Sequence, residues 1–331
     1  MSRLINNMQT VESLIVDVLA DNLTDSYSTK PHYCSPEFNN VVAAGAAELS
    51  GSTLCCAQLG LGLLLTAAAG GKRHKLLFDA GPDGAMLLGN ARNLGVSLRE
   101  VEAVAISHGH WDHMGGLLPA LDEIVDGNGA RKVACHVNPG MFLERGARLS
   151  TGAVASFQKV PSIKQLAARG VEVVNRAEAR MLLDELFYLS GEIPRITSFE
   201  KGRADHLCRD NVNEPWRPDP LIMDERYLAF HVGGKGMVVF SACSHAGIVN
   251  VLLDVRKQFP SVPIYAEFGG LHLGGAAMEK LIPDTVAGLR QFGCTQIIPA
   301  HCSGWRALRA LANEFGEGVV SQSAVGNRYS F

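Results

Sequence analysis

The segment Ser107-His108-Gly109-His110-Trp111-Asp112-His113 decides the fold of this chain. It begins at the end of residues 103–107, a short apolar and β-branched run that predicts a strand. Alternate side chains of an extended segment point the same way, so His108 and His110 can reach one cation. Asp112 and His113 then point to a neighbouring site. We therefore predict that His108, His110, Asp112 and His113 are metal ligands.

The donor atoms of this motif indicate which cations to expect. Nitrogen and oxygen ligands in this mixture suit zinc, and also iron or manganese. The alternative is a His-rich surface turn or a set of core histidines. Four candidate ligands at this spacing, followed by Gly115-Gly116, argue against it. We predict two divalent metal ions as cofactors, with zinc preferred.

The remaining chain alternates strand-like and helix-like segments in two halves. Gly233-Gly234-Lys235-Gly236 joins two apolar runs and is typical of a hairpin. Helices are expected at 163–169, 177–183 and 247–258, among others. Two strand-rich halves, each followed by helices, predict two packed sheets with helices outside. We expect a single domain over residues 1–331, with insertions near 24–40 and 146–220.

The motif resembles the His-x-His-x-Asp-His signature of the metallo-β-lactamase superfamily, which it matches without a gap. Leu76-Leu77-Phe78-Asp79-Ala80-Gly81 is similar to the superfamily's strand-to-Asp-Gly turn. The resemblance implies an α/β (α+β) protein, a four-layer αββα sandwich. It also implies that Asp79 braces the metal loop from behind the ligands. The alternative for Asp79 is a turn-capping aspartate.

Further segments narrow the resemblance to one branch of that superfamily, identified as 7,8-dihydropterin-6-methyl-4-(β-D-ribofuranosyl)-aminobenzene-5′-phosphate synthases. The chain departs from this branch at Ala57-Gln58-Leu59-Gly60, where the branch usually shows Glu-His-Gly. The segments that match are Ser190-Gly191-Glu192-Ile193-Pro194-Arg195, Phe240-Ser241-Ala242-Cys243-Ser244-His245-Ala246-Gly247-Ile248-Val249-Asn250, Gly269-Gly270-Leu271-His272-Leu273 and Pro299-Ala300-His301-Cys302.

The resemblance completes the expected ligand set. It implies that His301 binds the second metal beside Asp112 and His113. Cys243 and His245 follow a strand, at the place where many relatives carry a bridging Asp. We predict His245 as a ligand and leave Cys243 open, because a free cysteine often serves only core packing.

Most relatives have one more histidine ligand, between the motif and the bridging residue. The stretch at 190–195 contains none. His206 and His231 are the alternatives, although His206 lies in a polar insertion and His231 in a hairpin strand.

Catalytic and substrate-binding roles are assigned to four residues. We expect Asp112 and His272 to be catalytic, with His272 acting as an acid or base or holding a substrate oxygen. Glu192 and Arg195 are predicted to bind substrate, because Arg195 can grip a phosphate or carboxylate bidentately. The alternative for Arg195 is a surface salt bridge.

Composition limits the partners and the compartment. With 30 Lys and Arg against 33 Asp and Glu, the net charge is −3, so nucleic acid is not expected. Residues 54–70 are almost wholly apolar but short for a membrane span, which favours two buried strands. Cys55 and Cys56 are adjacent, and Cys135, Cys243 and Cys294 lie in apolar strand-like runs, which indicates reduced cysteines. The chain has no Cys-x-x-Cys pair, so a structural zinc knuckle is not expected. Residues 1–22 lack the features of a signal peptide. We expect a cytoplasmic protein with a small-molecule substrate, no membrane contact, and a homodimer left open.

The preferred function is hydrolysis of a small, phosphorylated or cyclic substrate by a metal-bound hydroxide. Three alternatives remain open. They are a dihydropterin/ribofuranosylaminobenzene phosphate synthase-like transferase, an iron-dependent redox enzyme, and a non-catalytic effector-binding protein.

Overall fold

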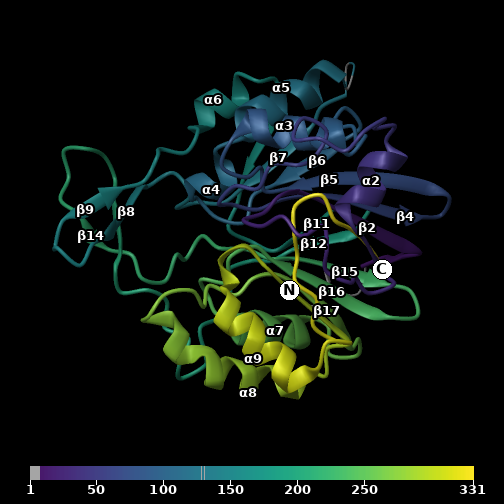
Figure 1. The fold of residues 1–331 in the computed structure, drawn as a ribbon. Coiled ribbons are helices and arrows are strands. Elements are labelled where there is room, and N and C mark those ends of the chain that lie inside the picture. The colour runs from purple at the N-terminus through teal and green to yellow at the C-terminus, as the bar shows by residue number, and fades with distance from the viewer. Residues whose placement is uncertain (1–7, 128, 130) are drawn as a thin grey trace.

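The computed structural model describes residues 8–127, 129 and 131–331. Residues 1–7, the start of the stretch considered above for a signal peptide, lie outside the described residues. Two β-sheets pack face to face at the centre, and helices cover the outer face of each (Figure 1). The predicted αββα sandwich of mixed α and β structure is therefore confirmed.

The first sheet comes mainly from the N-terminal half. Its strands are β2 (Ser13–Ala20), β3 (Cys34–Ser35), β4 (Gly62–Ala69), β5 (Lys72–Phe78), β6 (Ala103–Ala105), β7 (Ala134–Val137), β10 (Glu172–Asn175) and β19 (Arg328–Ser330), in the order β10-β7-β6-β5-β4-β2-β19-β3. Helices α2 (Glu37–Ala43), α3 (Gly84–Asn93), α5 (Leu117–Gly127) and α6 (Ile163–Ala167) lie on its outer side (Figure 1). Strands β5, β6 and β7 are parallel.

The second sheet comes mainly from the C-terminal half. Its strands are β1 (Thr10–Val11), β11 (Arg180–Leu182), β12 (Phe187–Leu189), β15 (Leu228–Val232), β16 (Gly236–Ser241), β17 (Ile264–Gly270) and β18 (Gln296–Ala300). The order is β11-β12-β15-β16-β17-β18, with β1 beside β15. Helices α7 (Ile248–Gln258), α8 (Ile282–Leu289) and α9 (Trp305–Phe315) cover it, with 3₁₀ turns η1 (Met278–Leu281), η2 (Arg290–Phe292) and η3 (His301–Ser303). The predicted hairpin is β15–β16.

The central strands are apolar because both of their faces are buried. Leu76 and Phe78 of β5 pack in the core between the two sheets, together with Phe240 of β16. Leu77 faces the helices of the first sheet, and Val239 faces those of the second. This double burial is expected of parallel strands covered by helices, and it explains why these runs are continuous rather than alternating.

A third, four-stranded sheet projects from the side of the sandwich (Figure 1). It contains β8 (Glu144–Arg148), β9 (Val154–Ser156), β13 (His206–Arg209) and β14 (Arg217–Pro218), in the order β14-β13-β8-β9. Strands β10, β11 and β12 also fall within residues 146–220 but belong to the two main sheets. The helix predicted at 177–183 is wrong, because this segment contains β11, which pairs with β12. The segment 24–40 contains β3 and the start of α2.

The apolar segment 54–70 lies in the sandwich. Its second half is β4, which is hydrogen-bonded to β2 on one side and to β5 on the other. Within the described part of the chain, no helix has both the length and the apolar character needed to cross a bilayer.

Strand direction gathers the candidate residues at one edge of the sandwich. Parallel neighbours end at the same edge of a sheet, and each of these strands is followed there by a loop. Asp79 follows β5, and His108 follows β6 in the same sheet. Cys243, His272 and His301 follow β16, β17 and β18, which are parallel in the other sheet. The fold therefore brings residues distant in sequence to one place.

Two glycines differ in the space available for an added Cβ atom, and this difference gives a first prediction. A Cβ on Gly109, in the motif loop, would lie 2.0 Å from the Met141 carbonyl oxygen, whereas a Cβ on Gly89 of α3 meets nothing within 4 Å. We expect Gly109→Ala to destabilise the fold by about 1–3 kcal/mol through overpacking. Gly89→Ala should stabilise it by about 0.5–1 kcal/mol, because alanine is the better helix former. Urea unfolding monitored by circular dichroism measures both, and equal midpoints would contradict the described loop packing.

Candidate metal centre

Asp79 fixes the motif loop from behind. Its carboxylate accepts hydrogen bonds from the Ser107 backbone N–H and hydroxyl, each at 2.7 Å. The same carboxylate lies 2.7 Å from Nδ1 of His113. The Ser107 hydroxyl also lies 2.9 Å from Nδ1 of His108. With the Nδ1 atoms occupied, Nε2 is the atom that His108 and His113 offer to the centre.

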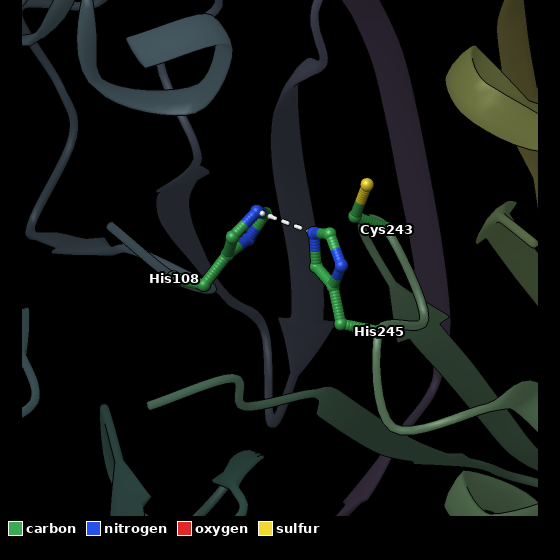
Figure 2. A group of neighbouring side chains, drawn as sticks. All are labelled: His108, Cys243 and His245. Atoms are coloured by element: carbon green, nitrogen blue, oxygen red, sulfur yellow. Dashed lines mark hydrogen bonds between the residues drawn. The ribbon is translucent and has the colours of Figure 1, made fainter. Parts of the chain in front are cut away.

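One group of imidazoles forms around His108. Its Nε2 lies 3.0 Å from Nδ1 of His110 and 3.1 Å from Nε2 of His245. Figure 2 shows His108 reaching in from one side, with His245 and Cys243 opposite. Burial is the largest of the effects that lower the pKa of His108, His110 and His245. The three rings are therefore neutral and keep lone pairs for a cation.

A second group forms around Asp112. Its carboxylate lies 3.3 Å from Nε2 of His301 and 3.7 Å from Nε2 of His113. Burial alone would raise the pKa of Asp112, but His113 and His301 hold it well below its usual range. Cys243 lies within reach of both groups. Its sulfur is within 4.8 Å of ligand atoms of His108 and His245, and also of those of His113 and His301.

Two consecutive buried acids tie the loops of the two halves together. Asp224 accepts a hydrogen bond from the Gly109 N–H at 2.8 Å and forms an ion pair with Arg145. Glu225 accepts hydrogen bonds from the N–H groups of His245 and Ala246, both at 2.7 Å. Neither acid is among the residues predicted from the sequence, because a charged Asp-Glu-Arg run normally indicates an exposed turn.

The last ligand candidate, His301, is held by the two residues that follow β2. Its N–H donates to Asp21 at 3.0 Å, and its Nδ1 lies 2.9 Å from the side-chain oxygen of Asn22. The Asn22 amide in turn donates to the His301 carbonyl. Sequence reasoning did not identify these residues, since 279 positions separate Asn22 from His301.

His206, considered above only as an alternative, lies at the centre. Its ring centroid is 5.5 Å from that of His110 and 5.3 Å from that of His245. It reaches the centre from β13 of the projecting sheet. The polar residues around it in the sequence therefore do not mean that His206 is remote from the centre. His231 instead lies in the β15–β16 hairpin, where its Nδ1 is 3.3 Å from the Thr10 hydroxyl oxygen.

Of the remaining predicted residues, one lies in the centre and two lie outside it. His272 lies in the centre, with Nδ1 3.1 Å from the sulfur of Cys243. Arg195 directs its guanidinium at backbone carbonyls, among them those of Leu221 and Ile222 in the segment between β14 and β15. Glu192 is exposed. The structure therefore does not bring Glu192 and Arg195 into contact with the imidazole groups, and their substrate roles remain predictions.

Backbone strain is concentrated in the same loops. Eight described non-glycine residues have positive φ, and four of them border the centre: Asp79 (57°), Ser244 (48°), His272 (50°) and His301 (46°). Such conformations are uncommon without glycine and persist where surrounding contacts over-determine them. Their clustering supports a functional centre rather than ordinary core packing.

The residues present fit divalent cations. Nε2 atoms of His110 and His113 are buried without a hydrogen-bond partner. Leaving buried nitrogens unsatisfied costs free energy, and a cation would satisfy them. Neutral imidazoles beside a carboxylate are a ligand set suited to zinc.

Comparisons with known proteins agree with this geometry. Residues 65–155 match the family model described as the metallo-beta-lactamase superfamily. The chain is 28% identical over 276 residues to the 7,8-dihydropterin-6-methyl-4-(beta-D-ribofuranosyl)-aminobenzene-5′-phosphate synthase of Methanocaldococcus jannaschii, covering 78% of this chain and 86% of that protein.

Solved structures share the fold. Tm1679, described as a metal-dependent hydrolase of the beta-lactamase superfamily, superposes with a TM-score of 0.67 at 21% identity, covering 95% of this chain and 98% of that one. The metallo-beta-lactamase fold protein YhfI of Bacillus subtilis gives 0.52 at 12% identity, covering 97% and 100%. In its motif segment, its sequence similarity and its fold, the chain resembles proteins of the metallo-β-lactamase superfamily.

Proposed function

We propose that the protein is a metal-dependent hydrolase with two divalent cations, zinc preferred, acting on a small, phosphorylated or cyclic substrate. The observation that carries this proposal is the meeting of two ligand groups at one strand edge, with Cys243 within reach of both. His108, His110 and His245 would hold one cation, and Asp112, His113 and His301 the other. Cations in such a centre supply Lewis acidity and activate water near neutral pH.

A small pocket lies beside the centre, on the side from which a substrate would approach. Its cavity volume is about 20 Å³, and His245 and His272 form part of its wall. Leu271, Leu273 and Leu281 make much of the remaining wall apolar. His272 is therefore the side chain in position to bind a substrate oxygen or to pass a proton to a leaving group.

The charged groups near this pocket indicate which residue would contact an anionic group of the substrate. The N-terminus of α7 is already satisfied by the buried Glu200 carboxylate, which accepts the N–H groups of Val249 and Asn250, each at 2.9 Å. Arg203 lines the same pocket and is only half-buried, with Asp205 as its partner. We propose Arg203, rather than the helix end, as the contact for a substrate phosphate or carboxylate.

A synthase-like transferase is the second candidate, favoured by the 28% identity to the archaeal synthase. The departure at residues 57–60 counts against it. This segment lies against the motif loop, since a Cβ on Gly60 would be 2.3 Å from the Asp112 carbonyl oxygen. Gln58 in it is exposed. Pyrophosphate release that requires both a phosphoribosyl donor and a pterin would favour the transferase over the hydrolase.

Removal of one imidazole tests the hydrolase. Purified protein is assayed with a chromogenic phosphodiester and a simple lactone, before and after chelation and after zinc is restored. We expect His108→Ala to lower turnover by roughly 100-fold or more, because it disrupts one cation position. His231→Ala, in the distant hairpin, is the matched control and should behave as wild type. Unchanged turnover in His108→Ala would refute the proposal.

Asp79→Asn tests how the ligands are held. The amide keeps the size of the side chain but loses the charge that orients Ser107 and His113, so we expect zinc affinity to fall by about 10–100-fold. Competition with a chromophoric chelator measures this affinity. Asp254→Asn is the control, because Asp254 accepts a hydrogen bond from Tyr227 far from the motif loop. Equal zinc affinity in Asp79→Asn and wild type would exclude the bracing role.

A further inference from the structure

A third group of candidate ligands adjoins the centre and differs from it chemically. The sulfur of Cys243 lies 3.1 Å from the sulfur of Cys302 and 3.1 Å from Nδ1 of His272. The donor atoms of these three residues all lie within 4.8 Å of one another. Cys302 and His272 belong to neither of the two nitrogen and oxygen groups described above.

The topology of the second sheet creates this cluster. Strands β16, β17 and β18 are parallel neighbours ending at Ser241, Gly270 and Ala300. Cys243, His272 and Cys302 are each the second residue after the end of their strand. Gly270 pairs with Ala300 in register, so His272 and Cys302 leave the sheet side by side.

Local backbone features bring the side chains together. A Cβ on Gly270 would lie 2.6 Å from the Cys302 sulfur, so the glycine is needed for the thiol to approach. His272 has a φ of 50°, a left-handed conformation that directs its ring toward Cys243. The His272 N–H lies 3.3 Å from the Cys302 sulfur and completes the contact.

We propose that Cys243, His272 and Cys302 form a separate binding site for a soft cation of the Cu(I), Zn(II) or Cd(II) class. Two sulfurs and one imidazole are the ligands such ions prefer, whereas the neighbouring groups offer only nitrogen and oxygen besides Cys243. With metal–sulfur bonds of about 2.3 Å, a tetrahedral ion would set the sulfurs roughly 3.7 Å apart. This needs only a small opening of the observed 3.1 Å.

The site is accessible to a cation. Cys302 and His272 are partly exposed, and only Cys243 is fully buried. His272 also forms part of the wall of the small pocket beside the centre. Since the sulfur of Cys243 also lies within reach of the two nitrogen and oxygen groups, Cys302 is the residue that distinguishes the soft site.

Cadmium provides the test, because its bonds to thiolates absorb in the ultraviolet. Reduced, metal-free protein is titrated with Cd(II) and compared with Cys302→Ser. We expect the thiolate absorption to fall to about half and the cadmium affinity to fall by about 10-fold or more, through the loss of one of two sulfur ligands. Cys294→Ser removes a buried cysteine elsewhere and should leave both unchanged. A Cys302→Ser protein that matches wild type would overturn the proposal.

A second measurement tests the site without substituting Cys243, His272 or Cys302. Alkylation of the wild-type protein, followed by peptide mass spectrometry, should show Cys302 protected by Cd(II) while exposed Cys56 stays reactive. The same protection is expected in His110→Ala, where one nitrogen group is broken. Loss of protection in His110→Ala would assign the cadmium to the two-ion centre and overturn a separate soft site.

Discussion

Asp79 is a fully buried carboxylate at the end of β5, and its two oxygens are engaged by Ser107 and His113. A buried charge is costly unless it is hydrogen-bonded, so this arrangement forces the motif loop to take one conformation. The loop in turn presents the Nε2 atoms of His108 and His113 to the centre. A similar contact is made on the side of the second sheet. Buried Glu225 accepts a hydrogen bond from the His245 N–H and so fixes the backbone of the loop that carries His245. The positions of the candidate ligands are therefore fixed by carboxylates that accept hydrogen bonds from backbone and ring N–H groups.

The sequence allowed the fold and the core of the centre to be predicted, because their signals are local. The spacing of His108, His110, Asp112 and His113 and the apolar runs before them are readable within a few residues. What could not be predicted depends on long-range contacts. Asp224 belongs to a charged run whose burial is visible only once Arg145 and Gly109 lie against it. His206 comes from a projecting sheet whose pairing has no short sequence signal. The helix expected at 177–183 failed because pairing of β11 with β12 outweighs local propensity.

The two sheets contribute differently to the chemistry. The first supplies the motif loop, with its histidines and Asp112. The second supplies Cys243, His245, His272 and His301 from the ends of its parallel strands. The wall of the adjacent pocket comes from the second half of the chain, from Glu200 to Thr285. Similarity in the motif segment thus indicates the fold and a cation centre, whereas the substrate depends on a pocket wall that lies outside this segment.

Anomalous X-ray diffraction from crystals grown with zinc would locate the cations. We expect anomalous density at two positions, one among His108, His110 and His245 and the other among Asp112, His113 and His301. Zinc at neither position in crystals that otherwise reproduce this fold would contradict the proposed two-cation centre.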